Sequence, residues 1–242
     1  MSTQGKPVPT PNPVPLETAE KSGAVDPGRR RLLEAGIAAG VVVPAQALIG
    51  ATNVLAQSGT AGAYSDGKAA TLVIASHPYP DRSVVNKALW NTVENSQGIV
   101  FRRLESLYGD DIHGIDVETE RKAYEGMDRV VFMFPIHWFN LTPMLKAYFN
   151  EVWTQWAPQA LKGKKMLVVT TVGAKASAYT REGRIGFTIE EVLAPMKASA
   201  NYAGMIYLEP LAFLGVSEAD EKMIRACQDR LAERLRETSD KH

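Results

Sequence analysis

The sequence contains a single cysteine, Cys227, among 242 residues. An internal disulfide and a metal site built from several thiolates are therefore excluded. The four histidines are scattered without the spacing of metal ligands. Neither sign of charge is in excess, because 27 basic residues balance 27 acidic ones, so the chain gives no electrostatic case for binding nucleic acid. With 45% hydrophobic and 22% charged residues, the composition indicates one soluble domain of ordinary size.

A long, strongly apolar run is missing from the N-terminal part of the chain. Residues 35–65 carry no charge, but the central stretch Ile37–Ala51 is only moderately apolar because Gly, Ala, Pro and Gln interrupt it. Arg29 and Arg30, followed by one residue and two leucines, precede this segment. A twin-arginine pair before a mildly apolar segment is typical of a removable export signal, whereas a strongly apolar segment suits a membrane anchor.

This pattern predicts three parts of the chain. Residues 1–56 form a disordered leader, proline-rich at 6–15, together with the twin-arginine export signal. Residues 57–69, rich in Ser, Gly and Ala, form a flexible linker, and residues 70–242 form the folded domain. We expect export to the periplasm with cleavage near Ala56. Two alternatives stay open: an uncleaved membrane anchor, or an ordinary amphipathic leader whose arginines are accidental.

The first unit of the domain is predicted to be a strand, a loop and a helix. The apolar run Leu72–Ala75 is typical of an interior strand of a parallel sheet. A polar loop, Ser76–Arg82, follows it, and Ser83 is placed as the N-cap of a helix. The free N–H groups of such a helix point into the loop and favour a phosphate. Ser83 and Asn86 are therefore candidate phosphate or ribose ligands, the alternative being that they only cap the turn.

Four further strand and helix units are predicted after the first. Their strands are Ile99–Leu104, Val130–Phe134, Met166–Thr170 and Met205–Leu208, and their helices start near Val117, at Pro143, at Thr188 and at Ser217. The sequence therefore predicts an α/β fold, an open doubly wound five-stranded parallel sheet of order 2-1-3-4-5 with helices on both faces. Its ligand crevice is expected at the C-terminal ends of the first, third and fourth strands.

Two more loops are expected at that same edge of the sheet. Pro135–Asn140 leaves the third strand, and its Trp138 and Phe139 offer flat apolar surface, unless they simply fill the core. Thr171–Gly186 is a long polar loop, of the length that is usually functional or disordered.

Motifs in the three loops resemble the flavodoxin-like NAD(P)H:quinone oxidoreductase family, the general stress protein 14-like NAD(P)H dehydrogenases (quinone). The motifs are His77-Pro78 with Asp81-Arg82-Ser83 and Asn86, then Pro135-Ile136-His137-Trp138-Phe139 with Pro143-Met144-Leu145-Lys146, then Thr170-Thr171-Val172-Gly173 with Tyr179 and Gly186-Phe187-Thr188. The resemblance covers roughly residues 70–215 and implies a flavodoxin-like fold.

The resemblance also implies the chemistry: a bound FAD or FMN accepts a hydride from NAD(P)H and passes two electrons to a quinone in a ping-pong reaction. It places at the flavin the residues His77, Ser83, Val85, Asn86, Pro135, Ile136, His137, Trp138, Phe139, Thr171, Gly173 and Tyr179. Tyr179 and His137 are the candidate catalytic residues, because they can orient the acceptor or donate a proton. A homodimer is implied as well, with Trp153 and Trp156 as candidate interface residues.

The sequence departs from the family pattern in the third loop. Some relatives have a histidine after the loop tyrosine, whereas this chain has Gly183-Arg184-Ile185-Gly186, in which only Arg184 can substitute electrostatically. Two other functions stay open. Because reduced nicotinamides are cytosolic, an exported protein could instead be a flavin-bearing electron carrier without a nicotinamide site. A flavodoxin-like domain that has lost its flavin could act as a binding module.

Overall fold

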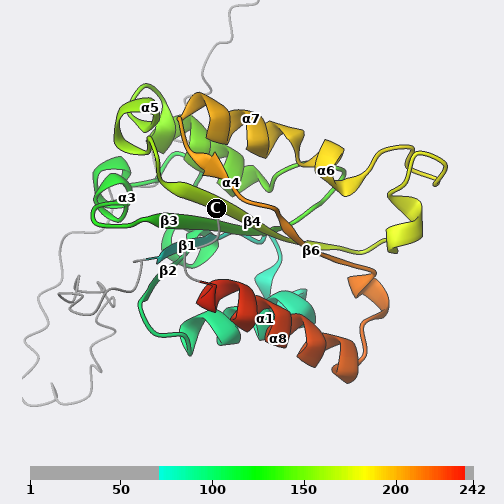
Figure 1. Ribbon diagram of the computed structural model, residues 1–242. Coiled ribbons are helices and arrows are strands. Elements are labelled where there is room, and N and C mark those ends of the chain that lie inside the picture. The colour runs from blue at the N-terminus through cyan, green and yellow to red at the C-terminus, as the bar shows by residue number, and fades with distance from the viewer. Residues whose placement is uncertain (1–70, 238–242) are drawn as a thin grey trace, which may run out of the picture. The chain divides into compact units, whose positions relative to one another are not determined.

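The computed structural model describes residues 71–237, which form one sheet with helices around it (Figure 1). The strands are β1 (Thr71–Ala75), β2 (Ile99–Arg103), β3 (Arg129–Pro135), β4 (Lys165–Val172), β5 (Ile206–Tyr207) and β6 (Leu211–Leu214). The α-helices are α1 (Val84–Glu94), α2 (Leu104–Tyr108), α3 (Val117–Lys122), α4 (Pro143–Tyr148), α5 (Ala157–Ala160), α6 (Ile189–Val192), α7 (Ala194–Tyr202) and α8 (Glu221–Arg236). The predicted leader, export signal and linker, with the cleavage site and the alternative membrane anchor, lie outside the described residues.

All strand pairs of the sheet are parallel, and the order β2-β1-β3-β4-β5 confirms the predicted order 2-1-3-4-5. The fifth strand predicted at Met205–Leu208 corresponds to β5, and β6 follows it as a second piece: β5 pairs with the start of β4 and β6 with its end. Pro210 lies between the pieces and has no N–H to donate to a ladder. The interruption therefore has a local chemical cause.

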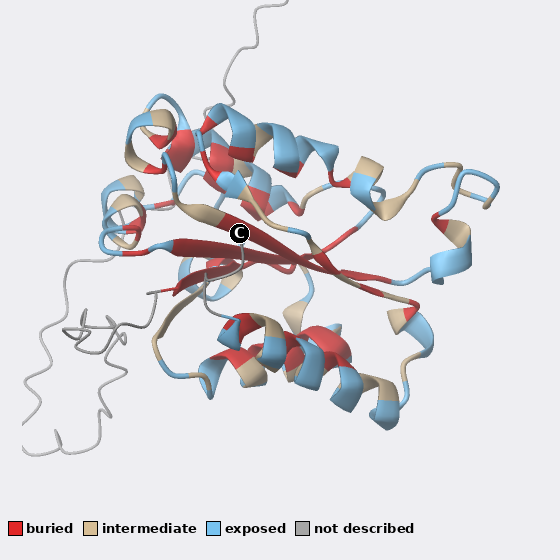
Figure 2. Cartoon of the chain, viewed as in Figure 1, coloured by how far each residue is buried: buried red, intermediate tan, exposed pale blue. Residues whose placement is uncertain are grey.

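Each face of the sheet is covered by helices, as predicted. Along β1, Leu72 and Ile74 belong to one core cluster while Val73 and Ala75 belong to the other, and all four are fully buried. Helices α1 and α8 cover one face, and α4, α5 and α7 cover the other (Figure 1). Buried residues line both sides of the strands (Figure 2). This two-sided burial explains why the strands are continuous apolar runs instead of alternating ones.

Two helix starts test the capping predictions. The start predicted at Thr188 is confirmed, and it forms a capping box: the Thr188 hydroxyl accepts a hydrogen bond from Glu191 N, and the Glu191 carboxylate accepts one from Thr188 N. The start predicted at Ser217 is wrong. Asp220 caps α8 by accepting a hydrogen bond from Met223 N at 2.7 Å. Ser217 lies in the preceding 3-10 turn and donates instead to Gly173 O at 2.7 Å.

The aromatic residues suggested for a dimer interface take other positions. Trp153 is buried, and its indole N–H donates to the Tyr124 hydroxyl at 3.0 Å, so the expectation that it is exposed is wrong. Trp156 is half-buried beneath the guanidinium of Arg121. Cys227 is buried on the inner side of α8. Among residues 71–237, no helix has the length and apolarity needed to cross a bilayer, and no group of His, Cys, Asp and Glu side chains could hold a metal ion.

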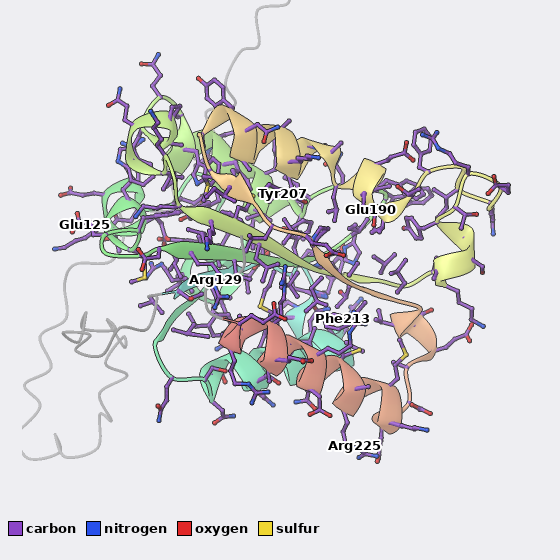
Figure 3. All side chains as sticks on the ribbon, viewed as in Figure 1. Glu125, Arg129, Glu190, Tyr207, Phe213 and Arg225 are labelled. Atoms are coloured by element: carbon purple, nitrogen blue, oxygen red, sulfur yellow. The ribbon has the colours of Figure 1, made fainter. Side chains whose placement is uncertain are left out.

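A buried arginine joins the sheet to the last helix. Arg129 opens β3 and lies beside the C-terminal end of α8 (Figure 3). Its guanidinium donates to Thr71 Oγ1 at 3.1 Å, to Leu235 O at 2.6 Å and to Glu237 O at 3.0 Å. These carbonyls have no partner within the helix, and a cation there also opposes the negative end of the helix dipole. One side chain thus satisfies the end of α8 and fixes it to the sheet.

We predict that Arg129→Ala lowers the free energy of unfolding by about 2–4 kcal/mol, because several buried hydrogen bonds to carbonyl oxygens are lost together. The matched control is Arg225→Ala, which removes an exposed pair with Glu221 on the same helix and should cost less than about 0.5 kcal/mol. Guanidinium chloride denaturation followed by circular dichroism measures both. Equal effects of the two substitutions would contradict the role of Arg129.

Candidate functional site

Three loops meet at the C-terminal edge of the sheet: the first loop (residues 76–83), the second loop (136–142) and the third loop (173–188). The rings of His77 and His137 join the first loop to the second, with centroids 5.7 Å apart. The rings of Phe139 and Tyr179 join the second to the third at 6.5 Å. The structure therefore brings the predicted site residues together, although they are up to 102 positions apart in the sequence.

The first loop ends at the N-terminus of α1, where Ser83 is the N-cap, as predicted. Ser83 Oγ accepts hydrogen bonds from Asn86 N at 3.3 Å and Asn86 Nδ2 at 2.9 Å. Within residues 71–237, nothing accepts a hydrogen bond from the N–H groups of Val84 and Val85, which belong to the first helical turn. Two free amides, a serine hydroxyl and the positive end of an 11-residue helix form a seat for a phosphate group.

Asn86 links this seat to the third loop. Its side-chain amide donates to Ser83 Oγ and also to Thr171 Oγ1 at 3.0 Å, so both of its N–H protons are already used. Thr171 O in turn accepts a hydrogen bond from Ile136 N at 3.0 Å. The predicted residues Asn86, Thr171 and Ile136 are all buried and hold the three loops in register.

The second loop is a tight turn with backbone strain. Asn140 N donates to His137 O at 3.2 Å, and the two residues between them, Trp138 and Phe139, have φ of 48° and 61°. Non-glycine residues in this left-handed region cost about 1–3 kcal/mol each and concentrate at functional sites. Because this turn aims both rings outward, Trp138 is 92% exposed and Phe139 47% exposed. The alternative that they fill the core is wrong.

The same turn leaves two donors free. None of the described residues accepts a hydrogen bond from the backbone N–H groups of Trp138 and Phe139. Pro135, the last residue of β3, is buried and fixes the point from which the turn leaves the sheet. The second loop therefore presents two aromatic surfaces and two backbone donors.

The third loop places Gly173 and Tyr179 at the site. A Cβ on Gly173 would lie 3.8 Å from its nearest neighbour, Ser217, an ordinary contact, so the fold itself does not require glycine here. The bare backbone leaves room for something outside the chain. Gly183 differs, because a Cβ there would lie 2.5 Å from Ser177 O. Arg184 beside it is exposed and has no ion-pair partner within the described part of the chain.

Two titratable groups of the site, His77 and Tyr179, stay uncharged near neutral pH. Burial lowers the pKa of His77 to about 4, and the neighbouring His137 acts in the same direction. Tyr79 N donates to His77 Nδ1 at 3.0 Å, so the proton of the neutral ring lies on Nε2, which can donate. Burial raises the pKa of Tyr179, so its phenol keeps its proton.

Three residues behind the loops were missed by the sequence reasoning. Ser76 Oγ donates to Glu105 Oε1 at 2.6 Å and shares a second hydrogen bond with Thr142 Oγ1. A local signal existed for Thr142 alone, since it precedes Pro143 and caps α4. Glu105 carries no local signal, because only the tertiary fold places α2 against the first loop.

Comparison with solved structures finds proteins whose nearly whole length aligns with about 70% of this chain. A crystal structure described as a thermophilic tryptophan halogenase from Streptomycin violaceusniger is 35% identical, with a TM-score of 0.66 over 69% of this chain and 99% of that one. General stress protein 14 of Treponema denticola, solved in complex with FMN, is 34% identical, with a TM-score of 0.63 over 68% and 98% of the chains. An NADPH-quinone reductase from P. pentosaceus is 25% identical, with a TM-score of 0.64 over 70% and 99%.

Curated relatives agree with these structures. General stress protein 14 of Bacillus subtilis is 37% identical over 171 residues, which are 69% of this chain and 97% of the relative. The uncharacterized NAD(P)H oxidoreductase YrkL of the same organism is 33% identical over the same shares of the two chains. The family with a flavodoxin-like fold matches residues 69–235. This chain therefore belongs to the flavodoxin-like fold family.

Proposed function

We propose that this protein is a flavin-dependent NAD(P)H oxidoreductase that gives two-electron reduction of quinones or similar acceptors, with FMN as its flavin. One observation carries the proposal. Two pairs of backbone N–H groups, at Val84–Val85 and Trp138–Phe139, have no acceptor among residues 71–237, and the first and second loops beside them are in contact. Relatives named as an NAD(P)H oxidoreductase and an NADPH-quinone reductase, and one solved with FMN, support it.

The first loop fits the phosphate of FMN. FMN ends in a phosphate monoester, whose charge suits the positive end of α1. Val84 N, Val85 N and the Ser83 hydroxyl would hold it, while Asn86 keeps Ser83 in place. FAD has no terminal phosphate, since an adenosine continues beyond it. A seat built from one helix N-terminus therefore favours FMN over FAD.

The second and third loops fit the flavin ring. The exposed faces of Trp138 and Phe139 offer apolar contact, and their amides can donate to the polar edge of the ring. Gly173 leaves space where a side chain would obstruct it. When bound, FMN supplies the hydride acceptance from NAD(P)H and the hydride donation to the quinone. The chain's own residues bind and orient the reactants.

Two side chains of the site, Tyr179 and His137, can act on the acceptor. The Tyr179 phenol, kept neutral by burial, is suited to donate a hydrogen bond to a quinone oxygen. His137 lies exposed at the start of the Trp138–Phe139 turn and is the second candidate donor to the quinone. A reduced acceptor gains protons as well as electrons, so a donor near its oxygen assists the reaction.

The proposal extends to assembly and location. The almost fully exposed Trp138 and the exposed Phe187 are large apolar side chains at the rim of the site, and a second copy of the chain would cover them in a homodimer.

The twin-arginine pair Arg29 and Arg30, with the mildly apolar segment after it, favours export of the protein to the periplasm. The exported electron carrier remains the alternative function, because the periplasm lacks a supply of reduced nicotinamide.

The first prediction from the proposed function tests the activity. Protein from residue 57 onward, loaded with FMN, is expected to lose its visible flavin bands on anaerobic addition of NADPH or NADH and to regain them with a quinone. The measurement is an absorption spectrum after each addition. Bands that persist with both nicotinamides would support the electron carrier, and a protein that takes up neither FMN nor FAD would rule out both functions.

The second prediction tests the phosphate seat. Ser83→Ala removes an N-cap and a phosphate ligand, so we expect about 1 kcal/mol lower stability and about tenfold weaker FMN binding. The matched control is Asp116→Ala, which removes the cap of α3 and should cost similar stability without changing FMN affinity. Fluorescence titration and thermal melting measure the two quantities. Equal FMN affinity in the two variants would place the phosphate elsewhere.

The third prediction concerns pH. The unfolded chain binds a proton on His77 below its ordinary pKa of 6.5, whereas the folded chain does so only near 4. Folding stability should therefore fall as the pH drops from 6.5 to 4, by up to about 3 kcal/mol from this residue. His77→Asn should flatten that part of the stability profile, while His113→Asn, at an exposed position, should keep it. Urea denaturation across this pH range measures the free energy of unfolding of each variant. Parallel stability profiles for wild type and His77→Asn would contradict the burial argument.

A further inference from the structure

A chain of hydrogen bonds runs behind the first and second loops. It begins at Glu105 on α2, passes through Ser76 after β1 and ends at Thr142, the N-cap of α4. Ser76 is 1% exposed and Thr142 is fully buried. Three elements that are distant in the sequence are thus tied together directly beneath the site.

The donors in this chain follow from the protons available. An ionised carboxylate only accepts, so Ser76 gives its single proton to Glu105. Thr142 must therefore donate in its hydrogen bond with Ser76, and its lone pairs accept from Leu145 N at 3.4 Å. In this arrangement each hydroxyl donates one hydrogen bond, and the donations run from Thr142 through Ser76 to Glu105. The chain ends at a buried helix cap, so it does not carry protons to the site.

Partial burial of the Glu105 carboxyl costs folding free energy. Glu105 is half-buried, and no cation within residues 71–237 forms an ion pair with it. Burial raises its pKa, with a smaller contribution from Asp110, whereas hydrogen bonds from Ser76 and from the backbone of His77 favour the ionised form. If this position contributed only to packing, an apolar side chain would stabilise the fold more than a carboxylate does. The carboxylate therefore has a task that an apolar side chain cannot perform.

That task concerns the relative position of two loops. Ser76 immediately precedes His77, and Thr142 is the last residue of the second loop. Ring contacts of His137 also join these loops, with the His77 ring at 5.7 Å and with the Tyr79 ring at 6.3 Å. Ring edges slide more easily than directional hydrogen bonds do. The hydrogen-bonded chain is thus the firmer link between the phosphate side and the ring side of the site.

We propose that Glu105 is a positioning residue of the flavin site: through Ser76 and Thr142, it holds the first loop against the start of α4 and so fixes the spacing between the phosphate seat and the Trp138–Phe139 turn. This inference rests on the proposed function, since the spacing matters only to a ligand that reaches both loops. Residues that hold ligand-binding groups at their productive separation contribute to affinity without touching the ligand.

The test compares FMN dissociation constants by fluorescence titration, with circular dichroism to confirm folding. Glu105→Ala and Ser76→Ala should each weaken FMN binding about tenfold, the value of one hydrogen bond to a charged group. Glu105→Gln keeps an oxygen that accepts from Ser76, so it should restore binding to within roughly threefold of wild type. The double variant should be no weaker than the weaker single variant, because one break already opens the chain. Ser96→Ala is the control, since it removes a hydroxyl that donates to Thr92 O at the end of α1.

Each outcome decides between the two proposals. Wild-type FMN affinity in Glu105→Ala, or equally weak binding by Glu105→Gln and Glu105→Ala, would overturn the positioning role while leaving the proposed function intact. Failure of the wild-type protein to bind FMN would overturn the proposed function and this role with it. Should Glu105→Ala not fold, Ser76→Ala carries the test alone, and its unchanged affinity would overturn the role.

Discussion

The parallel register of β1, β3 and β4 is the constraint on which the site depends. Thr71 pairs with Arg129, and Arg129 pairs with Lys165, so the three strands start level and all run in the same direction. Their following loops therefore leave one edge of the sheet, where ring contacts join the first loop to the second and the second to the third. The buried apolar runs supply the stability, and the edge, where strand pairing ends, is left to bind a ligand.

The strands and their order could be predicted because they follow from local sequence. An apolar run bounded by polar loops predicts a buried parallel strand, and the number of strand and helix units limits the topology. Details that depend on tertiary contacts could not be predicted in this way. Ser217 and Asp220 are both good caps by residue type, and only the hydrogen bond of Ser217 with Gly173 excludes it as the cap of α8. The burial of Trp153 likewise follows from its partner Tyr124.

The candidate site shows the same distinction between features set by local sequence and features set by tertiary contacts. The cap at Ser83 was predictable because it involves residues three positions apart. The outward direction of Trp138 and Phe139 was predicted only as one of two alternatives, since the left-handed backbone that causes it is held without glycine by the surrounding turn. Glu105 was missed because the contacts that define it join residues 29 positions apart in the chain. Local motifs thus identify candidate ligand-binding groups, and the three-dimensional structure identifies the residues that hold those groups in place.

The most direct measurement is a crystal structure of the protein with FMN. The account predicts a phosphate within hydrogen-bonding distance of Val84 N, Val85 N and Ser83 Oγ, and a flavin ring against Trp138 and Phe139 with its polar edge facing their amides. A flavin bound elsewhere, or a phosphate that leaves those amides free, would contradict the claim that the three loops form one flavin site.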